Sequence, residues 1–361
     1  MHADLAAALS DLVHACFGAA TSIDEITPLA GDASTRRYAR VGLTGPGAPG
    51  SAVVMLLADR GVAMSSEELA VFAQTPQELP YLNVHRFLHR LGVAVPDVYA
   101  DAADRGLLLL EDIGDTPLWD AVQDRPPAQT RRLYEAAIEQ LLLIQVEGTR
   151  RADPACIAFQ QTFDKRLFLW EFEHFIEFGL ERRLGRPLPA AEAAVLRQHF
   201  DAIATRLDAQ PRCLNHRDFH SWNLFVHAGR VRVIDFQDAL LAPAAYDLAT
   251  LLGDRDTPQV VTPALEATLL AYYQRRWAEV GGGDLGPEPF ADVYYLCALQ
   301  KALKVVGRFH FLDIVKGKPG YLRYLPPTVR QILRILPRFP ELAPVADVLR
   351  RHVDVMTTCE R

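Results

Sequence analysis

Hydrophobic residues follow two different periodicities along this chain. In the first third, short runs at residues 38–41, 51–57 and 106–110 are alternating or continuously apolar, as in β-strands. From Leu118 onward, apolar residues instead recur every three or four positions, which predicts amphipathic helices. The longest of these helical patterns cover residues 131–147, 162–184, 190–207 and 291–311.

Two earlier helices and three further strands complete the pattern. Apolar residues recur at helical spacing near the N-terminus, from Leu5 to Cys16, and again over residues 81–91. Strands are expected at 98–100 and, much later, as a pair at 224–226 and 231–234. Strands that come first and helices that follow predict an α+β fold, with an antiparallel sheet in the N-terminal part and a mainly helical remainder.

Composition limits the class of protein. The 361 residues are 50% hydrophobic and 23% charged, which fits a globular protein with one large or two medium cores. No apolar run approaches the roughly 20 residues that cross a bilayer. Asp4 and Asp11 interrupt the N-terminal pattern, which also lacks the basic start of a signal peptide. A formal net charge of −7 argues against binding to nucleic acid or to an anionic membrane.

Cysteine usage points to a reducing compartment. The five cysteines are odd in number, widely spaced and without a C-x-x-C pair, which argues against disulfides and against a zinc site. We therefore expect a cytoplasmic protein, and we expect it to be a monomer.

One stretch, residues 214–238, carries a recognisable chemistry. It reads LNHRDFHSWNLFVHAGRVRVIDFQD, in which His216, Asp218 and Asn223 have the spacing H-x-D-x-x-x-x-N and a hydrophobic run ends in Asp235. The two short strands are joined by a glycine-containing turn, so Asn223 and Asp235 are predicted at the open end of one hairpin. Their oxygens suit a hard cation such as Mg²⁺, which binds a few protein oxygens together with phosphate oxygens.

This arrangement indicates phosphoryl transfer. That reaction needs a metal to neutralise phosphate charge and a carboxylate to orient the attacking hydroxyl and accept its proton. Asp218 fits the carboxylate role, and Asn223 with Asp235 fits the metal role, while His216 and Arg217 are expected to support the loop. The alternative is that the match is accidental, with a packed loop histidine and aspartates that only cap turns.

Three stretches together resemble a known family. They are GDASTRRYARV at 31–41, LNHRDFHSWNL at 214–224 and QKALKVVGRF at 300–309. The central one resembles the catalytic motif of the aminoglycoside phosphotransferase family, a branch of the protein-kinase-like fold. The three together are similar to the anomeric sugar kinases of bacterial cell-wall recycling, which phosphorylate N-acetylmuramate and N-acetylglucosamine at C1.

The resemblance implies a bilobal kinase-like fold that binds ATP with Mg²⁺. It implies an N-lobe at 1–110, a hinge at 111–115 and a C-lobe at 116–361. The turn between the first two strands becomes a candidate phosphate loop, although Gly-Asp also occurs in ordinary turns. Main-chain groups of the hinge would bind the adenine, unless this segment is a plain strand-to-helix connection. The residues expected to bind the nucleotide are Gly31, Ser34, Thr35, Arg36, Arg37, Glu111 and Ile113.

The sequence departs from the family at one strand. The run SAVVMLL at 51–57 has no lysine, whereas the family usually places there a lysine that pairs with nucleotide phosphates and a helix glutamate. A matching glutamate is also not evident in the helix at 81–91. We therefore expect Arg36 or Arg37 to supply the missing positive charge.

The acceptor side is expected in the C-terminal half. Few residues separate Phe236 from the helix that follows Pro243, which leaves no room for the activation segment of a protein kinase and favours a small-molecule acceptor. By resemblance the acceptor is an amino sugar; a kinase for an aminoglycoside, choline or a ketosamine and a nucleotide-binding pseudokinase are the alternatives. Asp247, near a helix start, is expected to cap the helix or brace the loop. The residues expected to face the acceptor are Glu171, His174, Gln300 and Lys304.

Overall fold

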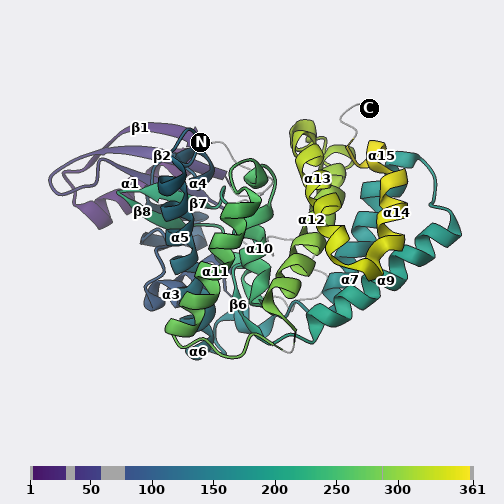
Figure 1. Ribbon diagram of the computed structural model, residues 1–361. Helices are drawn as coiled ribbons and strands as arrows, with labels where there is room; N and C mark the ends of the chain where they lie inside the picture. Colours follow the sequence, from purple (N-terminus) through teal and green to yellow (C-terminus); the bar gives the residue numbers. More distant parts are fainter. Residues whose placement is uncertain (1–2, 30–36, 58–77, 287, 358–361) are drawn as a thin grey trace. The chain divides into compact units, whose positions relative to one another are not determined.

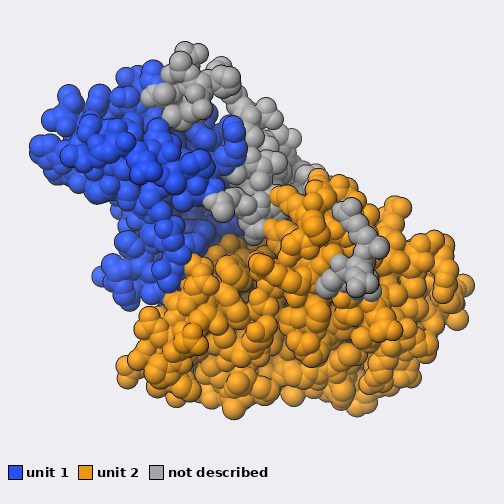
Figure 2. Space-filling model, turned by 90° about the horizontal axis from the view of Figure 1, so that it is seen from above, with its two compact units in different colours: residues 1–116, 225–238 blue, residues 117–224, 239–361 orange. Residues whose placement is uncertain are grey.

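The computed structural model describes residues 3–29, 37–57, 78–286 and 288–357 (Figure 1). These residues form two compact units, coloured separately in Figure 2. Unit 1 contains residues 1–116 and 225–238, and unit 2 contains residues 117–224 and 239–361. No helix among the described residues is long and apolar enough to cross a membrane.

Unit 1 is built on one five-stranded antiparallel sheet. The strand order is β1-β2-β3-β5-β4, and every neighbouring pair is antiparallel. The first helix, α1, lies against one face of the sheet and buries Leu9 and Val13 among Val41, Val54 and Leu107. The bounds are α1 Ala3–Phe17, β1 Ser22–Leu29, β2 Arg37–Thr44, β3 Ser51–Leu56, β4 Val98–Ala102 and β5 Leu107–Glu111.

Helix α3 (Pro80–Leu91) of unit 1 has clear start and stop signals. Proline occupies its first position, and it ends at Gly92, whose φ of 82° lies in the left-handed region that glycine adopts without strain. Tyr81 packs its ring 4.9 Å from the ring of Phe236. The helix thus holds the segment that immediately follows Asp235.

The hairpin of β7 (Leu224–His227) and β8 (Arg230–Val233) forms as predicted, and most of it belongs to unit 1. Ala228 and Gly229 have φ of 48° and 75°, as a type I′ turn requires. The hairpin bonds to its unit through Val226 N–H to the carbonyl of Thr116, 2.8 Å, and Val233 N–H to that of Ala94, 2.9 Å. These bonds explain why residues 225–238 belong to unit 1. The expected division instead placed the whole hairpin in the C-lobe at 116–361.

Unit 2 is mainly helical. Its strands β6 (Arg212–Asn215) and β9 (Leu240–Pro243) form a short antiparallel pair that the sequence did not predict. Its helices are α4 Leu118–Ala121, α5 Pro127–Leu142, α6 Gly148–Arg150, α7 Lys165–His174, α8 Arg182–Leu184, α9 Ala190–Asp208, α10 Ala245–Gly253, α11 Pro263–Glu279, α12 Phe290–Ile314, α13 Leu325–Ile335, α14 Ala343–Arg351 and α15 Val353–Thr357.

Two of the predicted helices of unit 2 contain π-helical turns. The pattern at 131–147 is α5 followed by the π-helical turn η2 (Leu143–Glu147), and the pattern at 162–184 is α7, the π-helical segment η4 (Phe175–Glu181) and α8. The second helix starts later than its pattern because Asp164 caps it, its carboxylate accepting the N–H of Leu167 at 2.9 Å. A wider π-helical turn shifts the phase of all later side chains.

Helix α12 occupies the centre of unit 2 and is buried on all sides along most of its length (Figure 1). It packs against α10, α13 and the α7–η4 helix. It comes very close to the α7–η4 helix at Gly307, where an added Cβ would lie 2.8 Å from the Cα of Phe175 and 3.0 Å from the carbonyl oxygen of His174. Only a residue without a side chain allows the two backbones to come so close.

Replacing Gly307 with Ala is expected to destabilise the protein by about 1–3 kcal/mol, because the new methyl group forces α12 away from Phe175. The measurement is urea unfolding followed by circular dichroism. Gly320→Ala is the matched control, since an added Cβ at Gly320 meets no atom within 4 Å. Equal free energies of unfolding for the two variants would contradict this prediction, because they would show that α12 moves away from Phe175 without loss of stability.

Candidate active site

The segment 216–223 carries most of the motif and directly follows β6, which pairs with β9. At the end of β6, the amide of Asn215 accepts a bond from Gln145 Nε2 at 3.0 Å and donates one to the carbonyl of Ala242 at 3.0 Å. All three residues are buried. This buried amide network fixes the chain direction just before His216.

Asp247 of α10 braces the next two residues. Its carboxylate accepts the backbone N–H of His216 at 2.5 Å and that of Arg217 at 2.9 Å. Arg217 has a φ of 82°, a region that non-glycine residues adopt only when their surroundings hold them there. Burial raises the pKa of Asp247 to about 7, while the two N–H donors favour its charged form. The expected role of Asp247 as a brace is thereby confirmed.

Asp218 follows directly, and its side chain remains 32% exposed. The ammonium group of Lys301, on α12, lies 2.8 Å from Asp218 Oδ1. Burial alone would raise the pKa of Asp218, but the positive charges of Lys301, Lys304 and Arg217 outweigh it and hold this pKa well below its usual value. Asp218 is therefore a charged carboxylate with one oxygen bonded to Lys301. Its role in orienting the acceptor hydroxyl remains a prediction.

A second carboxylate, Glu171 of α7, lies behind this loop and is fully buried. Its oxygens accept a bond from Gln300 Nε2 at 2.6 Å and contact Lys304 Nζ at 3.2 Å and Arg217 Nη2 at 3.7 Å. Three of the four residues that we expected to face the acceptor are thus clustered around one buried charge. Their contact with a sugar remains a prediction.

The fourth of these residues, His174, has different surroundings. It is buried, and its ring lies 5.4 Å from that of Trp170, 4.7 Å from that of Phe178 and 5.4 Å from that of Phe311. These contacts place His174 in an aromatic cluster between α7, η4 and α12. Sugar binding by His174 also remains a prediction.

The two predicted metal ligands, Asn223 and Asp235, lie in different units. In unit 2, Asn223 donates Nδ2 to the carbonyl of Asp218 at 3.0 Å, which leaves its amide oxygen Oδ1 as the atom for a cation. In unit 1, Asp235 has a φ of 63°, and its Oδ1 accepts a bond from Gln237 Nε2 at 2.9 Å. An amide oxygen and a carboxylate fit Mg²⁺, which takes one or two carboxylates together with phosphate oxygens. Their joint binding of Mg²⁺ remains a prediction.

Most of the predicted phosphate loop lies outside the described residues. This applies to Gly31, Ser34, Thr35 and Arg36. Arg37 is exposed at the start of β2, opposite Leu56 of β3. Replacement of the family's strand lysine by Arg36 or Arg37 therefore remains a prediction.

One main-chain N–H of the predicted hinge already has a hydrogen-bond partner within unit 1. The N–H of Glu111 donates to the carbonyl of Asp97 at 2.8 Å, and the carboxylate of Glu111 pairs with Arg232 of β8. The main-chain N–H of Glu111 is therefore already bonded within unit 1. Ile113 is buried two residues later. Binding of the adenine by main-chain groups of Glu111 and Ile113 remains a prediction.

Asp112 anchors this segment to the sheet. Its carboxylate accepts bonds from Arg40 Nε at 2.6 Å, from the hydroxyl of Ser51 at 2.6 Å and from the N–H of Gly114 at 2.9 Å. Burial alone would raise the pKa of Asp112, but the bonds from Arg40, Ser51 and Gly114 outweigh it and lower the pKa to about 2. The charged carboxylate thus stabilises the folded state.

Replacing Asp112 with Asn is expected to lower the free energy of unfolding by about 1–2 kcal/mol at pH 6. The folded pKa lies below the unfolded value of about 3.9, so this stabilisation is complete above about pH 4 and is lost as the pH falls through 2. Urea unfolding at pH 6 and pH 3 should show a smaller difference from the wild type at pH 3. Asp115→Asn, at a carboxylate that is 69% exposed, is the control. An Asp112→Asn difference that is the same at both values would contradict this prediction.

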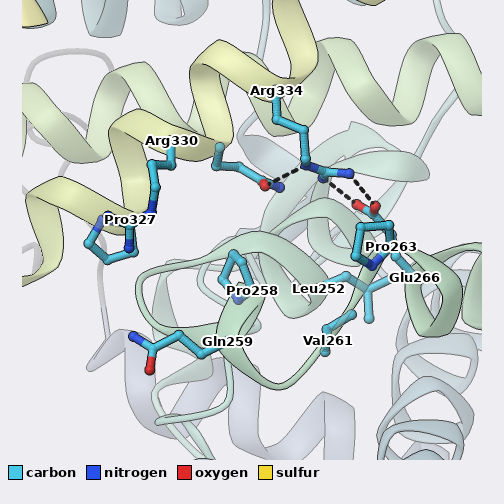
Figure 3. Close-up of a pocket in the computed structure, with 10 residues that line it drawn as sticks. Leu252, Pro258, Gln259, Val261, Pro263, Glu266, Pro327, Arg330 and Arg334 are labelled. Carbon is cyan, nitrogen blue, oxygen red and sulfur yellow. Dashed lines mark hydrogen bonds and ion pairs between the residues drawn. The ribbon is translucent and has the colours of Figure 1, made fainter.

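A separate cavity of about 160 Å³ lies elsewhere in unit 2 (Figure 3). Arg334 spans one side and donates to both oxygens of Glu266, at 2.8 and 3.0 Å, and to Gln331 at 3.0 Å. None of the predicted site residues lines this cavity. The cavity is therefore separate from the predicted site residues.

Comparison with known proteins shows the family of the chain. A sequence profile described as the phosphotransferase enzyme family matches residues 25–282. The chain belongs to this family. The family assignment makes the chain a phosphotransferase and confirms the resemblance that the motifs indicated.

Two relatives cover nearly the whole length of this phosphotransferase. The N-acetylmuramate/N-acetylglucosamine kinase of Pseudomonas aeruginosa is 31% identical over 332 residues, which are 90% of this chain and 88% of that protein. The protein of the same name from Neisseria meningitidis is 30% identical and covers 90% of each chain. The similarity therefore includes both units.

Solved structures confirm the predicted fold of this phosphotransferase. An ADP-bound aminoglycoside phosphotransferase matches it with a TM-score of 0.58 at 14% identity, covering 99% of this chain and 100% of that one. The choline kinase LicA from Streptococcus pneumoniae matches with a TM-score of 0.57 at 14% identity, covering 92% and 98%. The expected α+β kinase-like fold is thus confirmed.

Proposed function

We propose that this phosphotransferase transfers the γ-phosphoryl group of ATP to the anomeric (C1) hydroxyl of N-acetylmuramate and N-acetylglucosamine. The product is the sugar 1-phosphate, formed during recycling of the bacterial cell wall. The observation that carries the proposal is the similarity, over 90% of the chain, to relatives named N-acetylmuramate/N-acetylglucosamine kinase.

Asp218 is the group that acts on the acceptor in this proposal. The anomeric oxygen attacks the γ-phosphorus, the bond from that phosphorus to the β–γ bridging oxygen breaks, and ADP leaves. The proton of the hydroxyl passes to the carboxylate of Asp218. Mg²⁺, held by Asn223 and Asp235, would neutralise charge on the phosphates.

The charges around Asp218 support an acidic or neutral sugar as the acceptor. Three cations, Arg217, Lys301 and Lys304, lie in this group of side chains, each in contact with Asp218 or Glu171. A carboxylate such as that of N-acetylmuramate would be attracted to these cations, whereas a polycationic aminoglycoside would be repelled by them. The intact Asp218, Asn223 and Asp235 argue against a pseudokinase.

The test is incubation with ATP, Mg²⁺ and each amino sugar, followed by detection of a sugar phosphate that alkaline phosphatase cleaves. The methyl glycoside of N-acetylglucosamine, which is blocked only at C1, is the matched control and should give no product. Product from the methyl glycoside would place the phosphate at another hydroxyl. Turnover only of an aminoglycoside, choline or a ketosamine would favour the alternative acceptors, and no turnover of any acceptor would favour a pseudokinase.

A further inference from the structure

Lys301 contacts the predicted catalytic carboxylate directly, a contact that was not predicted from the sequence. Its Nζ lies 2.8 Å from Asp218 Oδ1 and 3.1 Å from the carbonyl oxygen of Arg217. The side chain is only 5% exposed and comes from the middle of α12, 83 positions after Asp218. One ammonium group therefore holds both the side chain of Asp218 and the backbone that precedes it.

The ammonium group of Lys301 also contacts an aromatic ring. Nζ lies 5.3 Å from the ring centroid of Tyr246, a fully buried residue at the start of α10. A cation over an aromatic face is attracted to it, more strongly when water is excluded. The ammonium group of Lys301 is surrounded by a carboxylate, a carbonyl and an aromatic ring, so it has little freedom to move. The carboxylate of Asp218, which it contacts, is restricted in the same way.

Two neighbours of Lys301 on the same helix contact a different carboxylate. Gln300 and Lys304 both bond to Glu171, whereas Lys301 bonds to Asp218. The remaining charged or titratable groups around Asp218 come from α7, α10, the segment after α10 and the catalytic loop itself. They are Glu171, Asp247, Asp254, Arg255, Arg217 and His220.

We propose that Lys301 is a positioning residue for phosphoryl transfer. By occupying Oδ1 of Asp218, it fixes the carboxylate so that Oδ2 is the oxygen that meets the acceptor hydroxyl and takes its proton. The inference rests on the proposed function, and it goes beyond that function by naming the atom that reacts and the residue that orients it. A misplacement of about 1 Å in such a contact is enough to cost about a hundredfold in rate.

The first test is Lys301→Met, which keeps the length of the side chain and removes the ammonium group. We expect kcat to fall about 100-fold while the KM for N-acetylglucosamine changes less than about threefold, because the contact acts on the reacting carboxylate. Lys301→Arg, which can still donate to Oδ1, should recover about tenfold of the loss. Lys165→Met is the matched control, since Lys165 is a surface residue paired with Asp201, and it should keep the wild-type kcat.

A double-mutant cycle separates positioning from general structural support. If Lys301 acts through Asp218, adding Lys301→Met to Asp218→Asn should change single-turnover rates by less than about twofold. If the two losses multiply, or if Lys301→Met alone keeps a kcat within about twofold of the wild type, the proposal is wrong. Thermal unfolding checks that each variant is folded, and Lys301→Gln replaces Lys301→Met in the cycle if the latter is not.

Failure of the inference and failure of the proposed function give different results. If the wild type does not phosphorylate either amino sugar, the proposed function is wrong and the same cycle is carried out with the acceptor that is turned over. If the wild type phosphorylates an amino sugar and the cycle is additive, only the role of Lys301 is wrong.

Discussion

Asp218→Asn is expected to lower kcat by about three orders of magnitude. Asn has nearly the shape of Asp but cannot accept the proton of the acceptor hydroxyl, and its amide offers only one acceptor oxygen to Lys301 and the hydroxyl together. The measurement is coupled release of ADP, with saturating ATP and N-acetylglucosamine, compared with the wild type.

Nucleotide binding should be little affected by the same substitution. The side chain of Asp218 is 32% exposed, and the bonds that brace the loop come from Asp247 and Asn215 instead. We therefore expect the dissociation constant for ADP to remain within about threefold of the wild-type value. Asp120→Asn, at an exposed residue of α4, is a control for the exchange of a carboxylate for an amide. Near-normal turnover by Asp218→Asn would remove the basis of the proposed mechanism.

Glu171→Ala is expected to cause the largest loss of stability, about 3–5 kcal/mol. Glu171 is fully buried and is the counter-charge for Arg217, which is 1% exposed, and for Lys304, which is 10% exposed. Its removal leaves two cations in a dry interior without that counter-charge, and it deprives Gln300 of its acceptor. The free energy of unfolding in urea measures the loss.

The same helix offers a matched control for this prediction. Glu173 is also paired with an arginine, Arg197, but both side chains are about half exposed, so Glu173→Ala should cost less than about 1 kcal/mol. If Glu171→Ala were no more harmful than Glu173→Ala, the buried cluster would contribute little to stability. The comparison separates the effect of burial from that of losing an ion pair.

The sequence predicted those parts of the site that are encoded over short distances. The spacing of Asp218 and Asn223 lies within one loop, and the turn at Ala228 and Gly229 follows from local backbone preferences. The face of α12 that carries Gln300 and Lys304 follows from the helical repeat, and both side chains do bond to Glu171 of α7.

Lys301 was missed because its role depends on tertiary packing. Adjacent residues on a helix point about 100° apart, so Gln300 and Lys301 face different neighbours. On a helix that is apolar around most of its circumference, the hydrophobic pattern does not indicate which face meets the catalytic loop. The pairing of β6 with β9 was missed for a similar reason, since each strand has only four residues and they are distant in sequence.

The short connection after the hairpin has a consequence for regulation. Phe236 is followed almost at once by β9, which pairs with β6, and then by α10. No serine, threonine or tyrosine lies between Phe236 and Ala245, and the next hydroxyl, that of Tyr246, belongs to a fully buried side chain. This connection offers no covalent on–off control of the kind that added phosphate exerts.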